Sequence, residues 1–137
     1  MASKIKHPEE AICKDFMRLV ESYTAAHPEL RWLMHIPNGG RRTKAEAGIL
    51  KAMGVRRGVA DYLLPSAQFC VTMAPTSGIG RHYHGLWIEM KAPGGKLTDE
   101  QLQFQMDMLN AGYAHAVHSD PLTAMSDVLR YLRGRWD

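Results

Sequence analysis

The chain has 137 residues, of which 45% are hydrophobic and 23% charged, so it can fill one core and is too apolar for a disordered chain. This length predicts a single domain over residues 1–137 and argues against a two-domain enzyme. The formal net charge of +3 is unevenly spread. Residues 41–57 hold six Lys or Arg side chains and one Glu, whereas the rest of the chain holds 11 bases and 13 acids. Such a segment favours an anionic partner.

In the first half of the chain, hydrophobic spacing and turn residues predict a helix over Pro8–Ala26, a strand over Leu30–Pro37, a turn at Asn38-Gly39-Gly40, a helix between Thr43 and Gly54, and a strand over Val59–Leu64. Two apolar stripes at helical spacing are expected to be buried. They are Ile12, Phe16, Leu19 and Tyr23 in the first helix, and Ala47, Leu50 and Met53 in the second.

In the second half, the pattern predicts an optional strand over Phe69–Met73, a loop at Pro75–Gly78, a strand over His84–Lys91, a helix from Thr98 to Gly112, a strand over Tyr113–His118 and a helix capped by Asp120-Pro121. The expected buried stripes are Leu102, Met106 and Leu109, followed by Leu122, Met125, Leu129 and Leu132. Strands that alternate with helices predict an α/β fold with a mixed central β-sheet flanked by helices.

Several classes of protein are excluded. Cys13 and Cys70 are too few for a disulfide framework, which favours a reducing cytoplasm. No run approaches the roughly 20 apolar residues of a membrane span, and the first residues lack the apolar region of a secretory signal. The absence of a G-x-x-x-x-G-K-[ST] loop leaves a nucleotide cofactor unsupported, and the histidines lack the spacing of a zinc site.

Acidic side chains lie at the ends of two predicted strands. Alternation places Trp87, Glu89 and Lys91 on one face of their strand, and Asp61 is an acid among apolar neighbours. If the two strands are adjacent, Asp61 and Glu89 can hold a divalent cation such as Mg²⁺, with Lys91 beside an attacking water. This arrangement suits phosphodiester hydrolysis. On the D…E-x-K spacing alone, however, an edge-strand charge pair is the commoner explanation.

Other candidates also have a structural alternative. Glu9 lies on the buried stripe of the first helix and Glu10 does not, although both acids also favour the positive end of that helix. Gln101 can orient a water or a phosphate, or can complete the T-x-x-Q capping box. A solvated face is the alternative for the basic segment, whose candidate nucleic-acid contacts are Asn38, Arg41, Arg42, Lys44, Arg56 and Arg57.

Three ordered blocks resemble the virus-type replication-repair nuclease (VRR-NUC) domain, a branch of the PD-(D/E)XK nuclease superfamily. They are HIPNGGRRTKAEAGILKAMGVRRGVADYLLP, HGLWIEMKAPGGKLTDEQ, and NAGYAHAV before a final helix ending in YL. The resemblance spans about Pro8 to Leu132 and implies a restriction-endonuclease-like core. Ala60 stands where the superfamily name has proline, and that proline is not a metal ligand.

The resemblance also implies site residues. Asp61 and Glu89 match the metal-binding acids, the main-chain carbonyl of Met90 is a further ligand, and Lys91 and Gln101 complete the catalytic set. A first-helix ligand matches Glu9, with Glu10 as the alternative. The implied protein is a phage- or prophage-borne, Mg²⁺- or Mn²⁺-dependent DNA endonuclease of the bacterial cytoplasm, acting in replication, repair or recombination. By the same analogy it is a homodimer that cuts branched DNA such as four-way junctions or flaps. The alternatives are a non-catalytic module that binds branched or single-stranded nucleic acid, and a sequence-reading nickase.

Overall fold

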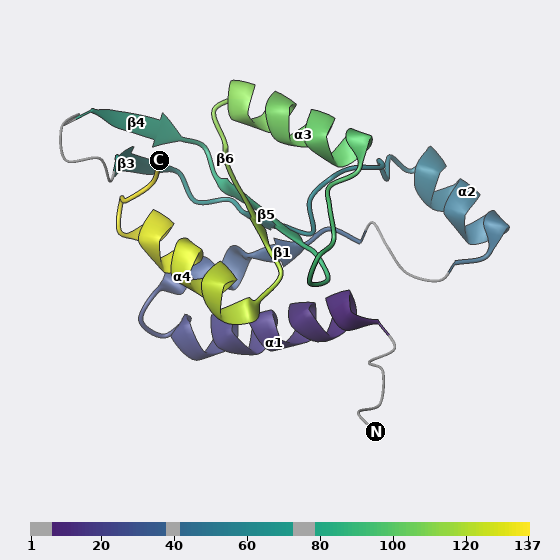
Figure 1. Cartoon of the computed structure of the whole chain (residues 1–137), viewed down its shortest axis with the longest axis horizontal. Helices are drawn as coiled ribbons and strands as arrows, with labels where there is room; N and C mark the ends of the chain where they lie inside the picture. The colour runs from purple at the N-terminus through teal and green to yellow at the C-terminus, as the bar shows by residue number, and fades with distance from the viewer. Residues whose placement is uncertain (1–6, 38–41, 73–78) are drawn as a thin grey trace.

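A mixed β-sheet forms the centre of the molecule (Figure 1). The computed structural model describes residues 7–37, 42–72 and 79–137. Within them the sheet has four strands, β1 (Met34–His35), β2 (Tyr62–Leu64), β5 (Leu86–Met90) and β6 (Ala114–His118), in the spatial order β1-β2-β5-β6. β5 runs parallel to β6 and antiparallel to β2, which in turn pairs antiparallel with β1.

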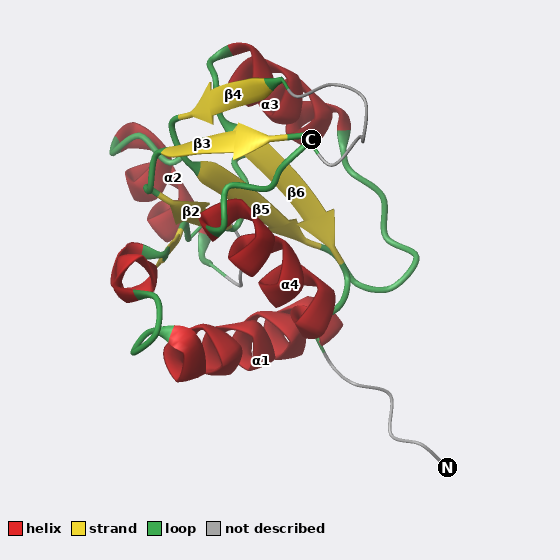
Figure 2. Cartoon of the chain, turned by 90° about the vertical axis from the view of Figure 1, so that its left-hand side faces the viewer, coloured by secondary structure: helices red, strands yellow, loops and turns green. Residues whose placement is uncertain are grey.

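The helices of the described residues lie on both sides of this sheet. They are α1 (Pro8–Tyr23), α2 (Lys44–Ala52), α3 (Asp99–Asn110) and α4 (Pro121–Leu132), with a short 3₁₀ helix, η1 (Pro28–Trp32). α1 and α4 pack together on one face, and α3 covers the other (Figures 1 and 2). The predicted α/β fold with a mixed, helix-flanked sheet is therefore confirmed. None of these helices is long and apolar enough to cross a bilayer.

The two faces of β5 differ in chemistry, as its alternation predicts. Leu86, Ile88 and Met90 are buried in the core that also contains Phe16 of α1 and Val128 of α4. On the opposite face, Trp87 packs edge-on against Phe104 of α3, with ring centroids 4.9 Å apart, and Glu89 accepts a hydrogen bond from Gln101 of the same helix. The polar face of β5 thus points toward α3.

Two predicted strands differ from the structure. Most of Leu30–Pro37 is not a strand, because Pro28 starts η1, whose Leu30 inserts into the core, and only β1 remains extended. The optional strand at Phe69–Met73 is present as β3 (Gln68–Val71). It pairs with an unpredicted strand, β4 (Gly80–Tyr83), in a separate two-stranded sheet, while the Pro75–Gly78 loop lies outside the described residues.

Several predicted buried stripes are wrong. Neither α2 nor α3 has a buried residue, and Met53 and Met106 are 77% and 57% exposed. α2 stands away from the sheet (Figure 1), and α3 turns Phe104 inward in place of Leu102, Met106 and Leu109. Tyr23 and Leu122 are also exposed, because they lie at the ends of their helices. Helical periodicity identifies an apolar stripe without specifying whether this chain covers it.

Candidate active site

Asp61 lies directly before β2, opposite the end of β5. The antiparallel register pairs Tyr62 with Ile88, which brings the preceding residue beside Glu89 and Met90. Asp61 Oδ2 accepts a hydrogen bond from the main-chain N–H of Met90 at 2.7 Å. Burial raises the pKa of Asp61 despite this bond. Asp61, which the sequence singles out as an acid among apolar residues, is therefore held beside the E-x-K segment Glu89–Lys91.

Glu89 is buried, with 4% of its surface exposed, and it has two polar neighbours on its own face. Its Oε1 accepts a hydrogen bond from Gln101 Nε2 at 2.9 Å and lies 3.8 Å from Lys91 Nζ. Burial and the charge of Asp61 raise the pKa of Glu89 to about 8, although Lys91 acts in the opposite direction. The structure thus brings Asp61, Glu89 and Lys91 together.

Gln101 completes the T-x-x-Q capping box, which is one of the two roles that the sequence left as alternatives, and it also contacts Glu89. Its Oε1 accepts a hydrogen bond from the Thr98 N–H at 2.9 Å, and its own N–H donates to the Thr98 hydroxyl, so the capping box is complete. The amide nitrogen that remains donates to Glu89. The start of α3 is therefore attached to the acid on β5, which fixes the orientation of that carboxylate.

The two first-helix acids point to different partners. Glu9 Oε1 accepts a hydrogen bond from the main-chain N–H of Ala92, just after β5, at 3.3 Å. Glu10 instead pairs with Lys14 at 2.6 Å on the surface of α1. Glu9 is accordingly the acid that contacts the strand carrying Glu89 and Lys91.

The donor set is compatible with a hard divalent cation. Asp61 and Glu89 are two acids with raised pKa values that share one nearby ammonium group, so the site lacks compensating positive charge. Within the described ranges no three His, Cys, Asp or Glu side chains form a ready-made metal cluster. Asp61 and Glu89 offer carboxylate oxygens, the ligand type that hard divalent cations prefer.

The structure describes only some of the residues proposed to contact nucleic acid. Asn38 and Arg41 lie outside the described residues. Arg42 donates a hydrogen bond to the carbonyl of Pro37, and Lys44 is the first residue of α2. In the part of the chain that the structure describes, none of the Lys or Arg side chains of residues 42–57 forms an ion pair, so these charges are not neutralised within the fold.

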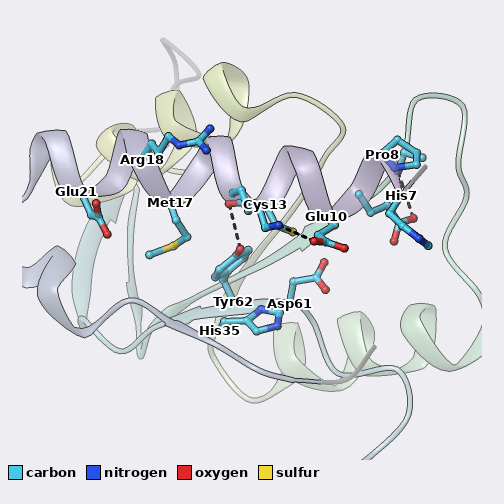
Figure 3. A pocket seen from close by; sticks show the side chains of 13 residues that line it. His7, Pro8, Glu10, Cys13, Met17, Arg18, Glu21, His35, Asp61 and Tyr62 are labelled. Atoms are coloured by element: carbon cyan, nitrogen blue, oxygen red, sulfur yellow. Dashed lines mark hydrogen bonds and ion pairs between the residues drawn. The ribbon is translucent and has the colours of Figure 1, made fainter. Parts of the chain in front are cut away.

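A cleft of about 860 Å³ opens beside Asp61, between α1 and the β1–β2 edge of the sheet (Figure 3). His35 and Tyr62 line it opposite Cys13 and Met17. Sequence reasoning missed this cleft. Its only local signal is that Cys13 and Met17 follow Glu9 at intervals of four, on one side of α1.

A solved structure described as a "VRR_NUC domain protein" matches this architecture with a TM-score of 0.64. The two chains are 21% identical, and the match covers 89% of this chain and 88% of the other. The chain has the fold of a VRR_NUC domain protein. The sequence itself matches no family model and no curated protein. The VRR_NUC likeness confirms the predicted restriction-endonuclease-like fold.

Proposed function

We propose that the chain is a Mg²⁺- or Mn²⁺-dependent nuclease that hydrolyses phosphodiester bonds in DNA. The observation that carries this proposal is the convergence of Asp61, Glu89 and Lys91 at one sheet edge, where two acids with raised pKa values share one ammonium group. The VRR_NUC fold supports the same function. A structural charge pair would need neither the third charged group nor the buried position of Glu89.

Each residue has a distinct proposed task. Asp61, Glu89 and the Met90 carbonyl would hold the cation, with Glu9 as a further ligand. A bound cation polarises the phosphodiester and lowers the pKa of a water molecule. Lys91 Nζ would orient the attacking water and offset the negative charge that develops on the phosphate. Gln101 is a positioning residue, because it contacts Glu89 and not the reacting atoms.

The basic segment supplies the expected contacts to the DNA backbone. Gly58 follows this segment directly and packs against α3, since a Cβ built on Gly58 would lie 2.6 Å from the main-chain oxygen of Glu100. Arg56 and Arg57 therefore approach the end of α3 that carries Gln101. We propose that these charges, with Arg42 and Lys44, bind phosphates that flank the cut. The proposed substrate is branched DNA in replication, repair or recombination in a bacterial or phage context.

We also propose that the active form is a homodimer. The apolar stripe of α3 (Leu102, Met106 and Leu109) is exposed on a helix with three acids and no base, and Ile49 and Met53 are exposed within the basic segment. Two copies related by a two-fold axis can pair these complementary surfaces reciprocally. Light scattering should give twice the monomer mass, and Met106→Glu should reduce it to the monomer mass. A monomeric wild type would refute this arrangement.

Cleavage of linear, flap and four-way-junction DNA tests the nuclease proposal. With Mg²⁺ the wild type should give product, preferentially from a branched substrate, whereas Asp61→Asn and Lys91→Ala should lose at least 100-fold in rate. Glu29→Gln, which neutralises an exposed acid on η1, is the matched control and should cut normally. Undiminished cleavage by the two site variants would overturn the assignment. Salt-sensitive binding without any product would favour the non-catalytic alternative.

A further inference from the structure

The cleft beside Asp61 is large enough for part of a substrate. Its volume of about 860 Å³ lies within the roughly 300–1,000 Å³ of pockets that enclose small molecules. It follows α1 from Glu9 to Glu21, which at 1.5 Å per residue is about 18 Å. Figure 3 shows Asp61 at one part of this cleft, with Met17 and Glu21 farther along the helix. A nucleotide next to the proposed cleavage site can therefore enter it.

The charges of the cleft select against a phosphate. Four carboxylates line it, those of Glu9, Glu10, Glu21 and Asp61, against the cations Lys14 and Arg18. Both cations are already paired, Lys14 with Glu10 at 2.6 Å and Arg18 with Asp15 at 2.5 Å. Away from the cation that Asp61 and Glu9 are proposed to hold, a phosphodiester would meet the uncompensated charge of Glu21. A nucleobase is neutral, and its N–H groups are donors for carboxylate oxygens.

One wall of the cleft is aromatic. The His35 and Tyr62 rings have centroids 5.2 Å apart, and Tyr62 is fixed by an edge contact with Phe16 and by a hydrogen bond to the carbonyl of Cys13. Tyr62 is buried, so the exposed ring of this wall is that of His35. Met17 lies across from it, and its polarisable thioether packs well against a ring. His35 and Met17 thus give the cleft an aromatic side and an apolar side.

We propose that this cleft binds one unpaired nucleobase of the DNA substrate, next to the phosphodiester at Asp61. This inference rests on the proposed nuclease function and supplies a physical basis for structure selection. A base in a single-stranded flap is already unpaired, whereas a base in intact duplex must first unstack and lose its partner. The cleft thus favours flap DNA over linear duplex, because only the flap offers an unpaired base.

A binding cycle tests the proposal. Affinity for flap DNA is measured by fluorescence anisotropy without divalent metal, with the four unpaired positions nearest the branch replaced one at a time by an abasic site. One abasic position should weaken wild-type binding roughly tenfold, as expected for loss of one stacked base. His35→Ala should weaken binding of intact flap by a similar factor and make it insensitive to that abasic site. His35→Phe keeps an aromatic ring without the imidazole nitrogens and should restore the sensitivity.

Further variants distinguish the cleft from a general loss of binding. Met17→Trp should fill the cleft and also remove the abasic effect, whereas Leu122→Trp, which introduces the same side chain at an exposed site on α4, should leave it intact. The inference is wrong if no abasic position weakens the wild type, or if His35→Ala retains the effect. These results are independent of cleavage, which is assayed separately with Mg²⁺. If the wild type cuts none of the DNA substrates, the nuclease proposal is refuted. If the wild type cuts DNA but the abasic effect on affinity is the same in the wild type and in the cleft variants, only the base-binding cleft is refuted.

Discussion

Replacing Glu89 with glutamine should abolish cleavage and stabilise the metal-free protein. The side chain keeps its shape, and its remaining oxygen can still accept the hydrogen bond from Gln101. What is lost is a buried negative charge next to Asp61. Burial and that neighbour raise the pKa of Glu89 from 4.5 to about 8, which means that the folded protein disfavours the ionised carboxylate.

The size of the effect depends on pH. Because the folded-state pKa is raised, the stability contributed by the protonated acid is fully present below about pH 4.5 and is lost as pH rises through about 8. At about 1.4 kcal/mol per pH unit between these values, ionisation costs on the order of 5 kcal/mol at pH 9. Relaxation around the site reduces this cost, so we expect Glu89→Gln to stabilise by about 2–4 kcal/mol at pH 9 and by less than about 1 kcal/mol at pH 5.

Thermal melts by circular dichroism measure this difference. At roughly 3–5 °C per kcal/mol for a chain of this length, Glu89→Gln should raise the Tm by about 10 °C at pH 9. Glu100→Gln, an exposed acid on α3, is the matched control and should change the Tm by no more than about 2 °C. Mg²⁺ should raise the wild-type Tm and leave that of Glu89→Gln unchanged. A variant no more stable than the wild type at pH 9 would refute the reasoning.

Three further predictions concern the elements that hold the site. Gly58→Ala should lower the free energy of unfolding in urea by at least about 2 kcal/mol, because Gly58 has φ +84° and a Cβ there meets a main-chain oxygen of α3. Gly48→Ala is the control: this glycine lies in open space within α2, and the change should raise the free energy of unfolding by about 0.5–1 kcal/mol. Phe16→Ala should cost about 3–5 kcal/mol, since Phe16 is fully buried; a loss below 1 kcal/mol would contradict its place in the core. Gln101→Ala should slow cleavage more than Thr98→Ala, since each removes one hydrogen bond of the capping box but only Gln101 contacts Glu89; equal rates would exclude a positioning role.

Much of the candidate site could be predicted because its parts follow from local chemistry. Strand alternation places Glu89 and Lys91 on one face, and both are found there. The Thr98 capping box locates the start of α3 and hence Gln101. The cleft could not be predicted in this way, because Met17 on α1 and His35 on β1 meet only through packing between distant parts of the chain. The unpredicted β4 has the same explanation, since its pairing with β3 is a tertiary contact.

The types and order of most elements, the chemistry of the E-x-K strand and the excess positive charge of residues 41–57 can all be read from the sequence. These features depend on interactions within a few residues, such as caps, turns and side-chain alternation. Three features depend on the folded arrangement: Asp61 accepts a hydrogen bond from the Met90 N–H, Glu9 rather than Glu10 contacts the residue after β5, and the apolar stripe of α3 stays exposed. Strand register and helix packing set these contacts, and both depend on burying the whole core at once.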